Sequence, residues 1–154
     1  MQRRNFLKRA GAGLAAGAAL VTPAVAATDP EIKWRLASSF PKSLDTIFGA
    51  AESLAKRVAA LTNNKFQIRV FAGGELVPGL QVLDAVSQGT VECGHTASYY
   101  YAGKNKAFVF DTAMPFGLTA RQQNAWFYYG GGLSLMRDLF KQYGIVNFPA
   151  APQC

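Results

Sequence analysis

The amino-acid sequence predicts an α/β fold with a mostly parallel sheet flanked by helices. Three short segments, residues 32–37, 66–70 and 91–95, alternate apolar with polar or basic side chains, as strands with one buried face do. Between them lie segments with apolar residues at three- and four-residue steps, as in helices. Since crossovers between parallel strands are right-handed and these links are short, the order places helices on both faces of the sheet.

The first strand and the helix after it have the clearest patterns. Residues 32–37 form the strand, and Pro41 ends the extended segment that follows. We expect Ser43 to cap the next helix, because a Ser side chain can accept a hydrogen bond from a backbone N–H of the first turn. The apolar stripe from Leu44 to Leu61 predicts a long amphipathic helix.

A turn and a short helix connect the second and third predicted strands. Gly73 and Gly74 mark the turn, and residues 80–86 have the helical spacing of apolar side chains. Gly89 is expected to end this helix, since glycine tolerates the positive φ that is common just after a helix end.

The last third of the chain predicts two helices and a strand. Thr119 is suited to cap a helix over residues 120–129, and residues 145–148 have the composition of a strand. The second helix spans residues 133–143, and four of its side chains are expected to face inward: Leu135, Met136, Leu139 and Phe140. The aromatic residues 126–128 are expected to need cover from outside this chain, which would make it adhere to hydrophobic surfaces.

Length and charge limit the classes of function. A chain of 154 residues, half of them apolar, has the size and composition of one folded domain. Its formal charge of +7 owes much to four basic residues near the start: Arg3, Arg4, Lys8 and Arg9. From Thr28 onward, Lys and Arg exceed Asp and Glu by only 3. The remaining basic residues are scattered and form no stripe, so we expect no nucleic-acid partner.

Residues 1–27 have the features of an export signal. Arg3 and Arg4 are followed by Phe6-Leu7-Lys8, and a mild Ala/Gly-rich stretch comes next. This spacing resembles the twin-arginine signal, which exports folded proteins; an ordinary secretory signal is the alternative. The small residues of the expected cleavage region are Ala24, Ala26 and Ala27. The mature protein is therefore expected in the periplasm, with the twin-arginine export machinery as one partner.

The sequence carries no positive signal for an enzyme. The two glycine-rich stretches, residues 73–74 and 130–132, lack the spacing of phosphate-binding loops. No nucleophile and general base form a recognisable catalytic set. Cys93 and His95 lie two residues apart on one expected strand and could supply half of a metal site, but no second pair completes it. The favoured interpretation makes both packing residues. The alternative function is a secreted, twin-arginine-exported enzyme with a metal near Cys93 and His95.

The run Tyr99-Tyr100-Tyr101 follows the third predicted strand. In an open parallel sheet, ligands bind just beyond the carboxyl ends of the strands. These rings could form a pocket wall that donates a hydrogen bond to an anionic or carbonyl ligand. They could equally form a packed corner whose hydroxyl groups bond the backbone. The pattern alone leaves both interpretations open.

Several long segments resemble a known family. They are WRLASSFPKSLDTIFGAAESLAKRV, FQIRVFAGGELVPGLQVLDAVSQGTVECGHTASYYYAGK, MPFGLTARQQNAW and GIVNFPA. Together they are similar to the solute-binding subunits of TRAP transporters (tripartite ATP-independent periplasmic transporters), the DctP-like family. The nearest subgroup binds 2-oxo acids and related small monocarboxylates. The resemblance runs from about Lys33 to Pro149.

The resemblance implies a fold and a site. The family has two α/β lobes that close over a ligand, and residues 28–149 correspond to the N-terminal lobe alone. The site residues that carry over are those of the loop after the first strand and the tyrosine run: Ser38, Ser39, Phe40, Tyr99, Tyr100 and Tyr101. Tyr100 and Tyr101 carry most weight.

The resemblance also implies what this chain lacks. The family's carboxylate-binding arginine and the ligands of its ligand-bridging metal ion belong to the second lobe, and no position of this sequence matches them. Residues 150–154 form an unlike tail, so the chain is expected to be a truncated and impaired product. The expected partners are a small carboxylate and the TRAP membrane subunits. We expect no cofactor and no catalysis.

Overall fold

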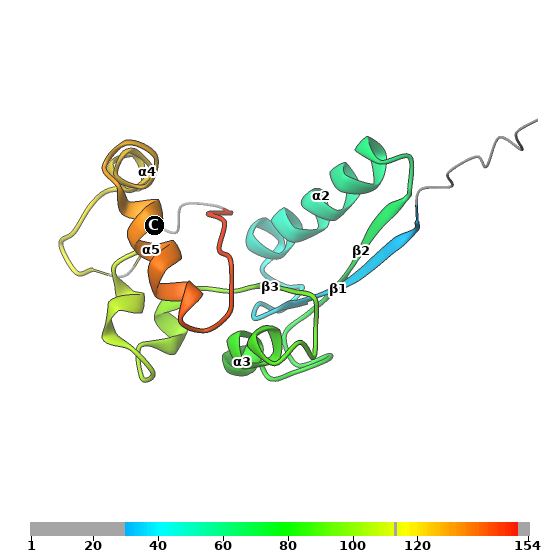
Figure 1. Ribbon diagram of the computed structural model, residues 1–154, viewed down its shortest axis with the longest axis horizontal. Coiled ribbons are helices and arrows are strands. Elements are labelled where there is room, and N and C mark those ends of the chain that lie inside the picture. The colour runs from blue at the N-terminus through cyan, green and yellow to red at the C-terminus, as the bar shows by residue number, and fades with distance from the viewer. Residues whose placement is uncertain (1–29, 113, 151–154) are drawn as a thin grey trace, which may run out of the picture.

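The computed structural model describes residues 30–112 and 114–150 (Figure 1). The predicted export signal therefore lies outside the described residues, together with most of the predicted tail. The signal positions concerned are Arg3, Arg4, Phe6, Leu7, Ala24, Ala26 and Ala27. The described chain forms two groups of elements, a small sheet with two helices and a helical group beside it (Figure 1).

The sheet has three parallel strands, as the sequence predicts, and their order is β2-β1-β3. They are β1 (Ile32–Ser38), β2 (Phe66–Phe71) and β3 (Cys93–His95). The strand β3 begins two residues later than predicted. The carboxylate of Glu92 accepts a hydrogen bond from the backbone N–H of Arg35 at 2.7 Å, so a side chain takes the place of a strand partner there.

The two helices of this group cover opposite faces of the sheet (Figure 1). The helix α2 (Asp45–Leu61) packs on β2 and buries Phe48 and Ala51. The short helix α3 (Val82–Ser87) follows the 3-10 turn η1 (Gly79–Gln81) and packs on β3. The core on the α3 side consists of four buried residues: Ala37, Val82, Ala85 and Val91. No helix in the described ranges is long and apolar enough to cross a membrane.

The ends of these helices partly match the sequence. Gly89 has φ +71° just after α3, so its predicted role at the helix end is confirmed. The predicted Ser43 cap is wrong, because Leu44 occupies the N-cap of α2 and no side chain caps this end. A turn precedes the helix instead, closed by the Leu44 N–H and the Pro41 carbonyl at 3.1 Å.

The second group of elements has its own core. It contains η2 (Ser98–Tyr101), η3 (Lys106–Val109), α4 (Ala120–Tyr129) and α5 (Gly132–Lys141). Six buried side chains form the core: Leu83, Tyr101, Phe108, Met136, Leu139 and Phe140. Leu83 belongs to α3, so this core continues into the sheet group.

Thr119 caps α4 as predicted, and Gln122 completes a capping box. Two other predictions for this region are wrong. Leu135 is 62% exposed rather than inward-facing, because α5 packs only through the stripe that contains Met136, Leu139 and Phe140. Residues 145–148 form no strand, since they pair with none of the described strands.

Candidate functional site: an aromatic wall at the carboxyl end of the sheet

The carboxyl ends of β1 and β3 lie side by side. Ser38 is in register with His95, and the Ser39 N–H donates to the His95 carbonyl at 2.8 Å. This pairing brings the loop after β1 next to the segment that leads into η2. The predicted site residues of both segments therefore gather at one edge of the sheet, where parallel sheets bind ligands.

Two glycines hold the backbone of the loop after β1. A side-chain Cβ at Gly73 or at Gly79 would lie 2.8 Å from the Ser39 carbonyl oxygen. The Gly73 N–H also donates to the Phe40 carbonyl at 3.0 Å. The turn between β2 and α3 can approach the loop this closely only because neither position has a side chain.

A chain of hydroxyl groups crosses the edge of the sheet. Ser39 Oγ lies 2.6 Å from the Gly79 carbonyl and 2.6 Å from Thr96 Oγ1. Thr96 Oγ1 lies 2.8 Å from the Tyr101 hydroxyl, which accepts the Leu83 N–H at 3.1 Å. A carbonyl can only accept, so the Ser39 proton goes to Gly79. Thr96 then donates to Ser39, and Tyr101 donates to Thr96.

This direction decides which groups have a proton left for a ligand. Tyr101 is 2% exposed and donates inside the protein, and the Ser39 proton is committed as well. This position of Tyr101 fits the packed-corner interpretation of the tyrosine run. Its contact with a ligand stays a prediction, as does that of Ser39.

Tyr99 and Tyr100 have a different environment. The three tyrosines lie on the 3-10 helix η2 and not on a strand, so successive side chains point about 120° apart. Tyr101 therefore points into the core while Tyr99 and Tyr100 stay half-buried. Burial raises the pKa of Tyr99, and neighbouring Tyr100 and Asp111 raise it further.

The ring of Phe40 joins the two half-buried tyrosines in one surface, which we call the aromatic wall (Phe40, Tyr99 and Tyr100). The ring centroids of Tyr99 and Tyr100 lie 4.9 Å apart, and those of Phe40 and Tyr100 6.1 Å apart. Phe40 is 3% exposed, so it forms the base of the wall.

Ser38 and His95 support Phe40 from behind. Ser38 Oγ accepts the Phe40 N–H at 3.1 Å, and it lies 3.3 Å from His95 Nδ1. The His95 ring meets the Phe40 ring edge-on at 5.2 Å. Burial lowers the pKa of His95, which favours the neutral ring. Which of Ser38 Oγ and His95 Nδ1 donates in this contact depends on the tautomer of the His95 ring.

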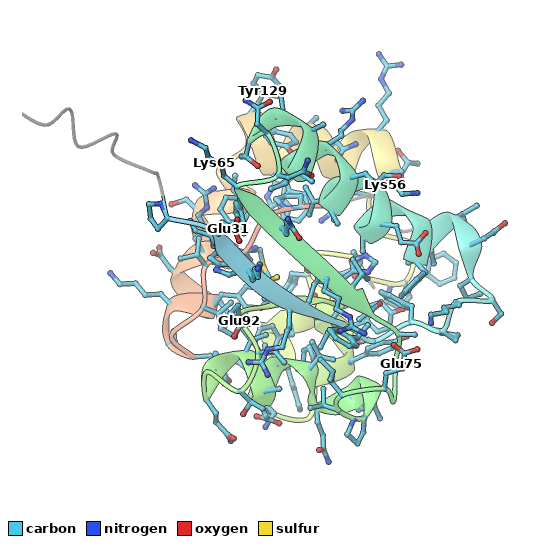
Figure 2. All side chains as sticks on the ribbon, turned by 90° about the vertical axis from the view of Figure 1, so that its right-hand side faces the viewer. Glu31, Lys56, Lys65, Glu75, Glu92 and Tyr129 are labelled. Carbon is cyan, nitrogen blue, oxygen red and sulfur yellow. The ribbon has the colours of Figure 1, made fainter. Side chains whose placement is uncertain are left out.

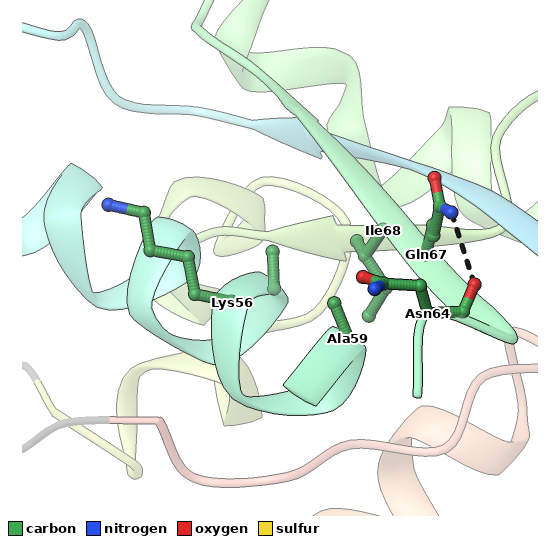
Figure 3. A pocket seen from close by; sticks show the side chains of 6 residues that line it. Lys56, Ala59, Asn64, Gln67 and Ile68 are labelled. Atoms are coloured by element: carbon green, nitrogen blue, oxygen red, sulfur yellow. Dashed lines mark hydrogen bonds between the residues drawn. The ribbon is translucent and has the colours of Figure 1, made fainter. Parts of the chain in front are cut away.

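Two surface hollows lie away from the aromatic wall. One, of about 290 Å³, lies between α2 and β2 and is lined by Lys56, Asn64 and Gln67 among others (Figure 3). Gln67 Nε2 donates to the Asn64 carbonyl at 3.1 Å beside it. The other, of about 520 Å³, is open and lies along β1 and β2, the two strands that face the viewer in Figure 2. Neither contains a predicted site residue.

Comparison with known proteins identifies the family. A family model described as "Bacterial extracellular solute-binding protein, family 7" (DctP) matches residues 37–148. The chain belongs to this family. The DctP match covers the loop after β1, the aromatic wall and the helices of both groups of elements, so the family resemblance and the expected periplasmic location are confirmed.

Three of the proteins similar to this chain have small carboxylates as named or bound ligands. A monocarboxylate 2-oxoacid-binding periplasmic protein of Nostoc sp. is 52% identical, over 97% of this chain and 42% of its own length. A TRAP solute-binding protein of Bordetella bronchiseptica, solved with calcium and picolinate, is 59% identical with a TM-score of 0.74. One of Colwellia psychrerythraea, solved with calcium and pyruvate, is 39% identical with a TM-score of 0.74.

The solved relatives confirm the fold class. Each of these two matches covers 77% of this chain, but only 35% and 36% of the solved chains. This chain thus spans well under half the length of the relatives named above. Its parallel sheet with flanking helices corresponds to part of the two-lobed periplasmic binding fold.

The metal-enzyme alternative gains no support from the side chains. Burial raises the pKa of the Cys93 thiol to about 11, so it stays protonated, and Sγ contacts the Arg35 carbonyl at 3.8 Å. The described part of the chain contains no group of three or more His, Cys, Asp or Glu side chains that could hold a metal. His95 is instead engaged by Ser38.

Two residues near the wall were not predicted from the sequence. Thr96 is the middle of the hydroxyl chain, and nothing in a single Thr before a tyrosine run indicates that role. Asp111 follows η3, and burial raises the pKa of its carboxyl group. Its position next to Tyr99 results from the packing of η2 on η3, which no local pattern predicts.

Proposed function

We propose that this chain forms the first lobe of a periplasmic solute-binding subunit of a TRAP transporter, and that its aromatic wall contacts a small 2-oxo carboxylate such as pyruvate. The observation that carries the proposal is the hydroxyl chain behind the wall. It uses the protons of Ser39 and Tyr101 internally and presents Tyr100 beside the Phe40 ring. The names of the relatives support the ligand class.

The wall suits capture rather than catalysis. The buried Phe40 ring supports the wall from below, and the Tyr100 hydroxyl can donate to a carboxylate or oxo oxygen. A hydrogen bond to a charged oxygen is stronger than one between neutral groups. Binding of this kind selects a ligand without changing it, in agreement with a family of solute-binding subunits.

The aromatic wall contains no positively charged side chain that could pair with the carboxylate of the ligand. Two lysines in the surrounding segments are already paired: Lys42 with Glu75 at 2.8 Å and Lys104 with Asp84 at 2.9 Å. The family resemblance assigns the carboxylate-binding arginine to a second lobe. We therefore expect the 154-residue chain by itself to bind pyruvate weakly, with a dissociation constant in the millimolar range.

A metal ion would not be held by the described residues of the wall. Calcium takes six to eight oxygen ligands and favours carboxylates, whereas the wall offers hydroxyl groups and one neighbouring carboxyl group, Asp111. The relatives solved with calcium or sodium hold picolinate or pyruvate as well. Closure over the ligand, transfer to the membrane subunits and twin-arginine export belong to the same proposal.

Calorimetric titration of the purified chain with pyruvate tests the proposed affinity. We expect heats that fit only a millimolar dissociation constant, and a micromolar constant would contradict the proposal. Tyr100→Phe should weaken that binding by roughly tenfold, the effect of one hydrogen bond to a charged group. The matched variant Tyr101→Phe should unfold more easily, because it leaves the Leu83 N–H unpaired.

A further inference from the structure

The hydroxyl group of Thr96 occupies a special place between β3 and η2. Its two partners are both side-chain hydroxyl groups, Ser39 at 2.6 Å and Tyr101 at 2.8 Å. The outer ends of the chain are backbone groups, the Gly79 carbonyl and the Leu83 N–H. Thr96 is thus the link between two segments that are each anchored to the start of the η1–α3 region.

The two segments carry the rings of the aromatic wall. Phe40 follows Ser39 in the chain, and Tyr100 precedes Tyr101. Each ring is therefore attached to the backbone next to a hydroxyl group that Thr96 holds. The ring centroids of Phe40 and Tyr100 lie 6.1 Å apart and do not stack, so ring stacking does not set their spacing.

We propose that Thr96 is a positioning residue, whose hydroxyl group sets the spacing of Phe40 and Tyr100 in the aromatic wall. Its role in the arrangement of the rings follows from this structure alone. Its effect on ligand binding rests on the proposed function. Thr96 itself touches no ligand in this account.

Two substitutions distinguish the effect of the Thr96 hydroxyl group from the effect of the rest of its side chain. Thr96→Val has nearly the same shape but leaves the Tyr101 proton without an acceptor and Ser39 without a donor. Thr96→Ser keeps the hydroxyl group and loses a methyl group. A positioning role predicts that Ser preserves the wall and that Val does not.

Nuclear magnetic resonance of the chain labelled at Phe and Tyr gives the readout. In wild type and Thr96→Ser we expect cross-peaks between the Phe40 and Tyr100 ring protons, and in Thr96→Val their loss. The ring contact of Phe108 with Phe140, at 5.1 Å in the other core, serves as the control for folding. Retained Phe40–Tyr100 cross-peaks in a folded Thr96→Val chain would overturn the proposal.

A second measurement decides the case even if Thr96→Val fails to fold. The Tyr101 hydroxyl proton should exchange slowly with water in wild type and show a cross-peak to the Thr96 side chain. Free exchange of that proton together with no cross-peak to Thr96 would overturn the proposal, because Thr96 would then not hold Tyr101.

Pyruvate titration distinguishes this inference from the proposed function. We expect Thr96→Ser to respond to pyruvate as wild type does and Thr96→Val to lose the response. If wild type itself shows no response, the proposed function fails, and the ring cross-peaks still decide the role of Thr96. If Thr96→Val binds as wild type does, the positioning role fails and the proposed function stands.

Discussion

Glu92 shows how one side chain can complete a sheet. Its carboxylate accepts the Arg35 backbone N–H at 2.7 Å, and the Arg35 guanidinium at 2.7 Å and 3.1 Å. Arg35 also reaches the Thr90 carbonyl at 2.8 Å. Glu92 therefore covers the edge of β1 where no strand pairs with it, and Figure 2 shows it beside that strand. An open edge of this kind invites pairing with other chains.

The Glu92 contact predicts a pH dependence. Hydrogen bonds from the Arg35 side chain and backbone lower the pKa of Glu92 from 4.5 to about 2. A lowered pKa stabilises the fold above pH 4.5, and this contribution is lost as the pH falls toward 2. Wild type should thus lose its stability advantage over Glu92→Gln across that range, as urea unfolding at several pH values would measure. Parallel pH curves for the two proteins would contradict this.

The two glycines behind Ser39 predict an intolerance to any side chain. Gly79→Ala would place a Cβ 2.8 Å from the Ser39 carbonyl, so the loop or the turn must move. We expect a loss of about 1–3 kcal/mol in the free energy of unfolding, as for other overpacked sites. Gly103→Ala is the matched control, since a Cβ there meets nothing within 4 Å. Equal stability of the two variants in urea would argue against the close approach.

At the scale of elements, two expected helix caps gave opposite outcomes. Thr119 caps α4 with its side chain, whereas Ser43 precedes α2 without capping it. Thr119→Ala should therefore lower the free energy of unfolding by about 1 kcal/mol, while Ser43→Ala should change it little. Denaturant unfolding of both variants checks this contrast. A larger effect at Ser43 would show that the start of α2 is wrongly assigned.

The elements show what a sequence pattern can and cannot predict. The strands and α2 were predictable because their apolar residues repeat with the period of the element over a sufficient length. The 3-10 helix η2 was not, since four residues with three tyrosines carry no period. Residues 145–148 look like a strand but need a neighbouring strand to pair with, which only the tertiary structure reveals.

The site was predictable to a similar extent. Parallel topology brings the loop after β1 next to the segment after β3, so the gathering of Phe40 and Tyr100 follows from strand order. The different environments of Tyr100 and Tyr101 depend on the turn of η2. The part played by Thr96 depends on distances of 2.6 Å and 2.8 Å across segments far apart in sequence.

At the scale of the whole molecule, the helical group exposes many apolar side chains. Its exposed apolar side chains include Phe116 at 109%, Tyr129 at 91%, Phe148 at 74% and Leu135 at 62%. Of the three aromatic residues predicted to need cover, Trp126 and Phe127 are half-buried against the core, and Tyr128 is 58% exposed. Surfaces of this kind adhere to other apolar surfaces.

This surface predicts dye binding by the isolated chain. We expect the purified protein to bind a hydrophobic fluorescent dye and to self-associate, as light scattering would measure. The double variant Leu135→Lys and Tyr129→Lys should reduce both effects, because it adds charge without touching the buried stripe of α5. A monomer that melts sharply and binds no dye would refute this expectation.

A pyruvate titration followed residue by residue by nuclear magnetic resonance tests whether the aromatic wall contacts a small 2-oxo carboxylate. Resonances of the labelled chain are recorded as pyruvate is added, with Tyr100→Phe as the matched variant. We expect shifts confined to Phe40, Tyr99, Tyr100 and their neighbours, a millimolar midpoint, and a weaker response in the variant. Shifts that gather elsewhere, such as the hollow between α2 and β2, or no shifts at all, would contradict the account.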